Sequence, residues 1–128
     1  MHKGFLRWAA FLAALSVALG AFGAHGLKKL VEPETVNSFE TGVRYQFYHA
    51  FALFLVAILF EKSPTKLLRW AGYSFLIGIV LFSGSLYLLT ALKATDTVGL
   101  TGIGIITPFG GLFFILGWLL IFLNFIRK

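Results

Sequence analysis

The sequence predicts an all-α membrane protein: a four-transmembrane-helix bundle with an interfacial helical extension before the second span. Hydrophobic residues make up 59% of the 128 positions and charged residues only 12%, whereas soluble domains carry about 25% charged residues. The apolar residues also fall in long blocks, close to the roughly 20 residues that a helix needs to cross a bilayer. These observations exclude a water-soluble domain of this length.

The first span is expected at residues 5–24. Lys3 and Arg7 before an apolar stretch are also typical of a signal peptide, but we expect the segment to be retained as a membrane span. Small residues recur along it at helical spacing, which permits close helix approach, so we expect this helix to lie inside the bundle. They form two rows: Ala10, Ala14 and Ala18, and Ser16, Gly20 and Ala24.

The second span is expected at residues 43–60, after the interfacial extension. Pro33 suits the first position of a helix, and apolar residues at helical spacing run from it into the span. A tight turn follows the span, in which Ser63 can cap the next helix and Pro64 can open it.

The third and fourth spans are expected at residues 67–92 and 107–126. The connection 93–104 holds several glycines but is mostly apolar, so we expect it to dip into the bundle. Thr107 can cap the N-terminus of a helix and Pro108 suits the first position of that helix, so this pair marks the start of the last span. The whole chain, residues 1–128, is therefore expected to form one transmembrane domain.

Lysine and arginine counts predict the orientation. The two ends of the chain and the turn at residues 61–69 carry seven of these residues, and the other two connections carry four. Because cytoplasmic segments of membrane proteins are enriched in Lys and Arg, we expect both termini to be cytoplasmic.

The charge pattern also bears on partners and chemistry. The net charge of +6 is spread over helix ends instead of forming a stripe, which argues against nucleic acid and favours membrane lipids as partners. The absence of Cys excludes disulfides, thiolate metal sites and a Cys nucleophile. Because no triad, paired carboxylates or HExxH spacing is present, we assign no catalytic residue, no metal site and no cofactor.

Polar residues gather where the second span enters the membrane, in the stretch TGVRYQFYHA at residues 41–50. Ionisable residues at membrane depth are costly and mark candidate sites. We expect the unusual polar residues of the four helices to converge in the outer half of the membrane, roofed by the connection 93–104. The candidate binding residues are His25, Arg44, Tyr45, Tyr48, His49 and Thr107.

Five of the six candidates also have a structural interpretation. His49 can be satisfied by hydrogen bonds to a neighbour, and His25 can be favoured at a helix end by the macrodipole. Arg44 can extend to lipid head groups or hold an anion. Tyr45 and Tyr48 can belong to an interfacial aromatic belt.

Four motifs in order resemble the domain of unknown function family 423, the YgdD/YwdK-like small inner-membrane proteins. The motifs are GAFGAHGL at 20–27, TGVRYQFYHA at 41–50, LFSGSLYLL at 81–89 and TPFGGLFFILGW at 107–118. The resemblance covers nearly the whole chain. It implies a four-helix protein integral to the bacterial cytoplasmic (inner) membrane, and it brings no established activity.

Three functions fit these observations. The leading hypothesis is a non-enzymatic helix-packing or accessory component of a membrane complex, as a homo-oligomer or with other subunits. The first alternative is a transporter or channel for a small solute, proton or anion, which would require an oligomer because four short spans leave little room for an aqueous path. The second alternative is a lipid- or quinone-binding membrane protein.

Overall fold

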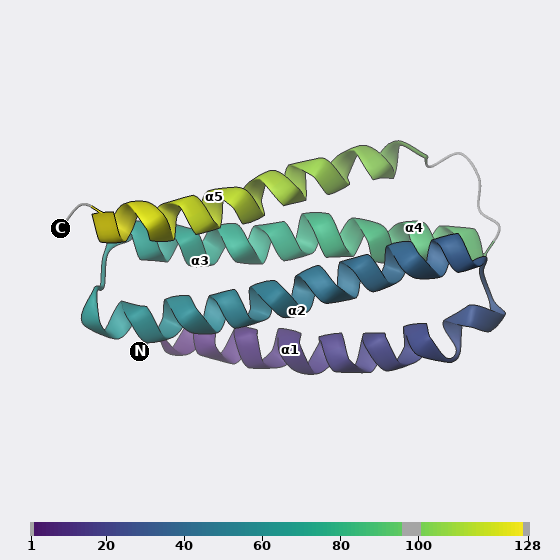
Figure 1. Cartoon of the computed structure of the whole chain (residues 1–128), viewed down its shortest axis with the longest axis horizontal. Helices are drawn as coiled ribbons and strands as arrows, with labels where there is room; N and C mark the ends of the chain where they lie inside the picture. The colour runs from purple at the N-terminus through teal and green to yellow at the C-terminus, as the bar shows by residue number, and fades with distance from the viewer. Residues whose placement is uncertain (1, 96–100, 127–128) are drawn as a thin grey trace.

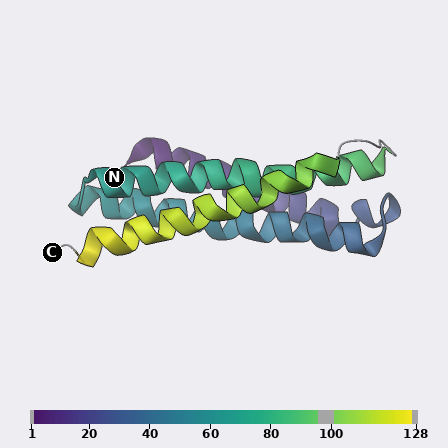
Figure 2. The ribbon, with the colours of Figure 1, turned by 90° about the horizontal axis from the view of Figure 1, so that it is seen from above.

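A computed structural model of the chain describes residues 2–95 and 101–126, and these residues form a bundle of long helices (Figures 1 and 2). The chain runs up and down the bundle axis, and both ends lie beside the turn between α2 and α3 (Figure 1). The elements are α1 (Lys3–Ala24), the 3-10 turn η1 (Leu27–Lys29), α2 (Pro33–Lys62), α3 (Lys66–Gly78), the π-helical turn η2 (Ile79–Ser83), α4 (Gly84–Ala94), the 3-10 turn η3 (Thr101–Ile105) and α5 (Ile106–Ile126).

Four helical segments of the described chain are long and apolar enough to cross a membrane, which confirms the predicted fold class. They are Lys3–Lys29, Pro33–Lys62, Lys66–Ala94 and Gly102–Ile126. The third segment joins α3, η2 and α4 into one continuous rod (Figure 1). The helix before the second span begins at Pro33, as the sequence predicts, and continues without a break into the span.

The start of α3 differs from the prediction. Thr65, not Ser63, caps the helix, because its Oγ1 accepts a hydrogen bond from the Leu68 N–H at 3.2 Å. Ser63 instead ends α2, since its N–H donates to the Leu59 carbonyl at 3.0 Å. Pro64 therefore lies in the turn and not in the first turn of the helix.

The first helix lies at the edge of the bundle, so the expectation that it packs inside the bundle is wrong. α1 packs chiefly on α2, whereas α2 also contacts α3, η2 and α4. Only 17% of the apolar window of the first segment is buried, against 44% for α2. One side of α1, with Ser16 and Gly23, is buried against α2, while the row Ala10, Ala14 and Ala18 is exposed.

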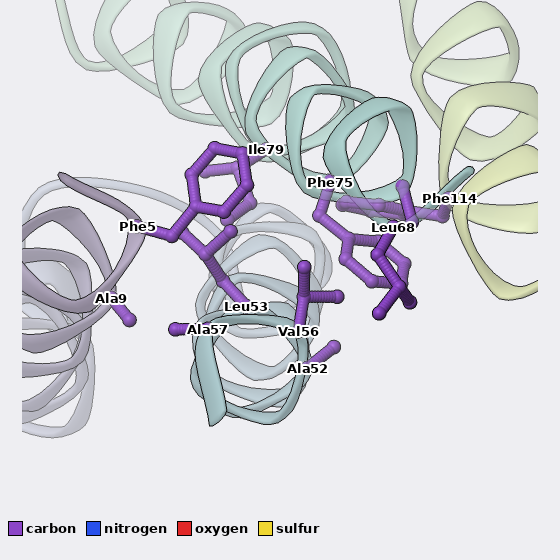
Figure 3. Packing of buried hydrophobic residues seen from close by; sticks show 11 residues of the cluster. Phe5, Ala9, Ala52, Leu53, Val56, Ala57, Leu68, Phe75, Ile79 and Phe114 are labelled. Carbon is purple, nitrogen blue, oxygen red and sulfur yellow. The ribbon is translucent and has the colours of Figure 1, made fainter. Parts of the chain in front are cut away.

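Two apolar clusters hold the helices together. The larger one joins side chains from α1, α2, α3, η2 and α5 (Figure 3). The smaller one lies at the connection between α1 and α2, where Leu27, Val36 and Phe39 are buried. The buried members of the larger cluster are Phe5, Ala9, Ala52, Leu53, Val56, Ala57, Leu68, Ala71, Phe75, Ile79 and Phe114.

Glycines allow α5 to lie directly on α3 and η2. A Cβ atom at Gly110 would overlap the backbone of Phe82, so at this point the two helices touch through their main chains. At two further positions a phenylalanine ring of one helix covers a glycine of the other, in the pairs Gly78–Phe114 and Gly117–Phe75. Close approach through small residues is a common way for helices to associate in lipid.

Candidate functional site

The most buried of the predicted site residues is His49, which lies in an aromatic cluster between α2 and α5. Its side chain is 5% exposed. The imidazole stacks on the Phe114 ring with centroids 3.6 Å apart and an angle of 8° between the planes. Phe75 and Trp118 contact the same imidazole at centroid distances of 5.5 and 6.0 Å. The sequence placed this histidine at the mouth of the second span, and the fold packs it against the last helix.

Both ring nitrogens of His49 are hydrogen-bonded. The indole Nε1–H of Trp118 donates to Nε2 at 3.1 Å, and Nδ1 lies 2.7 Å from the Tyr45 carbonyl oxygen. Because an indole N–H can only donate, Nε2 must accept, so the proton resides on Nδ1 and is donated to the Tyr45 carbonyl. The arrangement therefore selects the neutral imidazole and leaves neither nitrogen free for a ligand.

A second group of polar side chains joins three helices through Gln46. This side chain is 1% exposed. Its Nε2 donates to the Leu12 carbonyl of α1 at 2.9 Å, and its Oε1 accepts from the Tyr87 hydroxyl of α4 at 2.6 Å. Nearby, Ser83 of η2 donates to the Gly42 carbonyl of α2 at 2.6 Å. These bonds connect the α1, α2 and α3–α4 rods inside the apolar bundle.

A third polar group ties the end of α5 to the turn between α2 and α3. Asn124 is buried, its Oδ1 accepts from Thr65 at 2.6 Å, and its Nδ2 donates to Ser63 at 3.2 Å. Near the other end of the bundle, the hydroxyls of Ser85 and Thr107 are 2.5 Å apart and link α4 to α5. Among the described residues, every buried side-chain nitrogen or oxygen has a hydrogen-bond partner.

The other predicted site residues do not join His49 through hydrogen bonds in the described chain. Arg44 is exposed and donates to Thr41 Oγ1 at 3.1 Å. His25 is exposed at the end of α1, and Tyr48 is 54% exposed. Thr107 is bonded to Ser85, as described above.

Only Tyr45 shares the surroundings of His49. Its carbonyl binds the imidazole, and its ring packs on Phe82 with centroids 4.8 Å apart. The Tyr48 ring in turn contacts the Tyr45 ring at 5.8 Å.

The expected convergence of His25, Arg44, Tyr48 and His49 into one connected site is therefore corrected by the geometry. Arg44 and His49 are five residues apart, and at 3.6 residues per turn they project about 140° apart around α2. Arg44 consequently faces the side of α1, while His49 faces α5. Whether any of the six residues binds a ligand stays a prediction.

The predicted roof over the site falls partly outside the described residues, which omit 96–100. Within the described part, Gly102 and Gly104 of η3 are exposed. Among residues 2–95 and 101–126, no three His, Asp or Glu side chains lie close enough together to hold a metal ion.

Three residues whose side chains make hydrogen bonds between separate segments were not among the predicted site residues: Gln46, Trp118 and Asn124. Gln46 lies within the stretch that the sequence highlighted, but it was not among the six candidate residues. The signal available for Gln46 and Asn124 was their type, since amides inside apolar spans commonly bond across helices. Nothing in the sequence pairs Trp118 with His49, because the two are 69 positions apart.

Comparison with known proteins shows similarity to a family of unknown function and to membrane proteins. A family model described as "Protein of unknown function (DUF423)" matches residues 19–111. The UPF0382 membrane protein YwdK of Bacillus subtilis is 43% identical over 120 residues, which is 93% of each chain. A UPF0382 membrane protein of Haemophilus influenzae is 40% identical over 93% of this chain and 90% of its own. The UPF0382 inner membrane protein YgdD of Escherichia coli is 36% identical over 95% of this chain and 88% of its own. No solved structure gives a significant match.

Proposed function

Since the chain belongs to the DUF423 family of membrane proteins, we propose that it is a non-enzymatic accessory component of a membrane complex. In this proposal it resides in the bacterial cytoplasmic (inner) membrane with both termini in the cytoplasm. It acts by packing a transmembrane helix, from a second copy or from another subunit, against α1. The observation that carries the proposal is the exposed row of small residues on α1: Ala10, Ala14 and Ala18.

The exposed row suits a helix partner for a physical reason. Lipid tails are as apolar as leucine, so helices in a bilayer associate through close packing and not through the hydrophobic effect. Alanines four residues apart lie on one side of a helix and let a second backbone approach closely. The opposite side of α1 already packs on α2 within the chain, so this row is available to a partner.

The internal polar groups support association over transport or binding. His49 uses one ring nitrogen in a bond within α2 and the other in a bond to α5, and Gln46 uses its amide nitrogen and its oxygen in bonds to α1 and α4. These bonds leave neither ring nitrogen of His49 free for a solute, and three of the four join α2 to another helix. The polar residues of the interior therefore favour a structural role.

The orientation in the proposal rests on the distribution of basic residues. Seven of the eleven Lys and Arg residues belong to the two ends of the chain and the turn at 61–69, and both ends and this turn lie at the same end of the bundle (Figure 1). Cytoplasmic segments are enriched in these residues. YgdD, a relative, is named an inner membrane protein.

Affinity purification from native membranes in a mild detergent tests the proposal. We expect wild type to retain a stoichiometric second copy or subunit, and Ala14→Leu to lose it because a bulky side chain prevents close approach. Ala91→Leu is the matched control, since Ala91 is an exposed alanine of α4, and this variant should keep the partner. The proposal fails if wild type purifies as a lone monomer, or if Ala14→Leu retains the partner as well as the control does.

A further inference from the structure

Two hollows lie along the same side of α2, next to α1. The first has a volume of about 330 Å³ and is lined by Lys28 and Glu40 together with Pro33, Val36 and other residues. The second has a volume of about 210 Å³, and Gly20, Val43, Arg44 and Phe47 are among its lining residues. The α2 residues of both hollows recur every three or four positions, from 33 to 47, so they share one face of the helix. The hollows therefore follow one another along α2.

The two hollows differ in chemistry. The first contains charged side chains of both signs near the connection between α1 and α2. In the second, Arg44 and Ser16 are the polar members, and Ser16 already donates to the Leu12 carbonyl at 2.8 Å. A charged hollow followed by an apolar one along a membrane-spanning helix matches the polarity of a phospholipid.

Arg44 lines the second hollow, and most of its donors are free. A guanidinium has five N–H donors, and in the described chain the hydrogen bond to Thr41 Oγ1 is its one side-chain contact with a polar group. No carboxylate of the described residues makes an ion pair with it. Arginine binds phosphate groups through a planar fork of parallel hydrogen bonds, so an exposed, largely unsatisfied guanidinium at this position is suited to a phosphate.

We infer that this face of α2 binds one anionic phospholipid of the phosphatidylglycerol class. The phosphate accepts hydrogen bonds from Arg44, and an acyl chain lies in the apolar hollow against Gly20 and Val43. The glycerol head group enters the charged hollow, where its hydroxyls donate to Glu40 and Lys28 adds positive charge. Arg44, Lys28 and Glu40 sum to a charge of +1, which a lipid of charge −1 balances and a zwitterionic lipid does not.

Native mass spectrometry of the purified protein in detergent, with phosphatidylglycerol or phosphatidylethanolamine added, tests the inference. We expect wild type to bind one phosphatidylglycerol in preference to phosphatidylethanolamine. Arg44→Gln should lower the phosphatidylglycerol affinity about tenfold, the usual effect of losing a hydrogen bond to a charged group. Arg7→Gln is the matched control, because Arg7 is exposed on α1 and lines neither hollow. This variant should bind phosphatidylglycerol with the wild-type affinity.

A second variant tests the apolar half without touching the charge. A Cβ atom at Gly20 would have only an ordinary contact, 3.5 Å from Val43 Cγ1, so Gly20→Leu extends its side chain into the hollow and should also weaken lipid binding. The helix content of each variant, measured by circular dichroism, identifies any that does not fold. The inference is overturned if wild type binds the two lipids equally or binds neither of them. It is also overturned if Arg44→Gln and Gly20→Leu both fold and both retain the wild-type affinity for phosphatidylglycerol.

Discussion

Gly110→Ala should be among the most damaging single-methyl changes in the protein. An added Cβ at this position would lie 2.7 Å from Phe82 Cα and would also overlap the Phe82 backbone nitrogen. Backbone atoms within a π-helical turn cannot rotate away as a flexible side chain can. The α5 helix must therefore move away from η2, which would also disturb the neighbouring Gly78–Phe114 contact.

The expected cost can be worked from two opposing effects. Adding a methylene to a well-packed site typically costs about 1–3 kcal/mol, and contact with backbone puts Gly110 in the upper part of that range. Replacing glycine by alanine inside a helix also stabilises the helix by about 1 kcal/mol, which offsets part of this cost. We expect Gly110→Ala to lower the free energy of unfolding by about 1–2 kcal/mol.

The next residue supplies a matched control for this experiment. A Cβ at Gly111 would lie 3.9 Å from Phe82 Cδ2, an ordinary contact, so Gly111→Ala should be neutral or stabilising by up to about 1 kcal/mol. Unfolding of both variants in mixed micelles, as a function of the fraction of denaturing detergent, measures the difference. If Gly110→Ala is as stable as Gly111→Ala, the direct backbone contact between α5 and η2 is refuted.

The hydrogen bonds between helices lead to three further predictions. Gln46→Leu should lower the free energy of unfolding more than Tyr87→Phe, because it removes two bonds instead of one, each worth about 0.6–1.7 kcal/mol in a membrane; detergent unfolding that ranks them in the opposite order would contradict this. Nitrogen NMR of His49 should show a neutral imidazole protonated on Nδ1, and Trp118→Phe should alter the Nε2 resonance; an imidazole protonated on Nε2 would be incompatible with the Trp118 bond. Asn124→Leu should increase proteolytic cleavage at the α2–α3 turn, and cleavage at the wild-type rate would show that this tie is dispensable.

Much of the fold could be predicted because it depends on length and hydrophobicity. A span must be about 20 residues long and apolar, and the described helices cover the predicted ranges 5–24, 43–60, 67–92 and 107–126. Pro33 marked the start of α2 correctly because its fixed backbone angle suits the first turn of a helix. These features are local, so the sequence carries them directly.

The arrangement of the helices could not be predicted in the same way. The small residues of α1 were compatible with a buried or an edge position, because a row of alanines permits packing without saying what supplies the partner. Ser16 of one row is buried and its neighbour Gly20 is half-buried, whereas Ala14 and the rest of the other row are exposed. Only the contacts between helices distinguish the two rows.

The candidate site failed to converge for a related reason. The sequence predicts polar residues at similar depth on adjoining helices, but the direction of each side chain around its helix decides its partners. His49 turns to Trp118 on α5, and Gln46 turns to Tyr87 on α4, while Arg44 faces the flank of α1. Polar groups inside an apolar bundle need hydrogen-bond partners, and the partners that His49 and Gln46 find on other helices lie outside the predicted set.

Cross-linking in native membranes is the most direct test of the claim that the protein functions through the exposed face of α1. Because the chain contains no cysteine, single-cysteine variants at Ala10, Ala14 and Ala18 can be compared with a control at Ile115, which is exposed on α5. The account predicts efficient cross-links, to a second copy or to another subunit, at the three α1 positions and few at Ile115. Equal yields at all four positions, or none on α1, would contradict it.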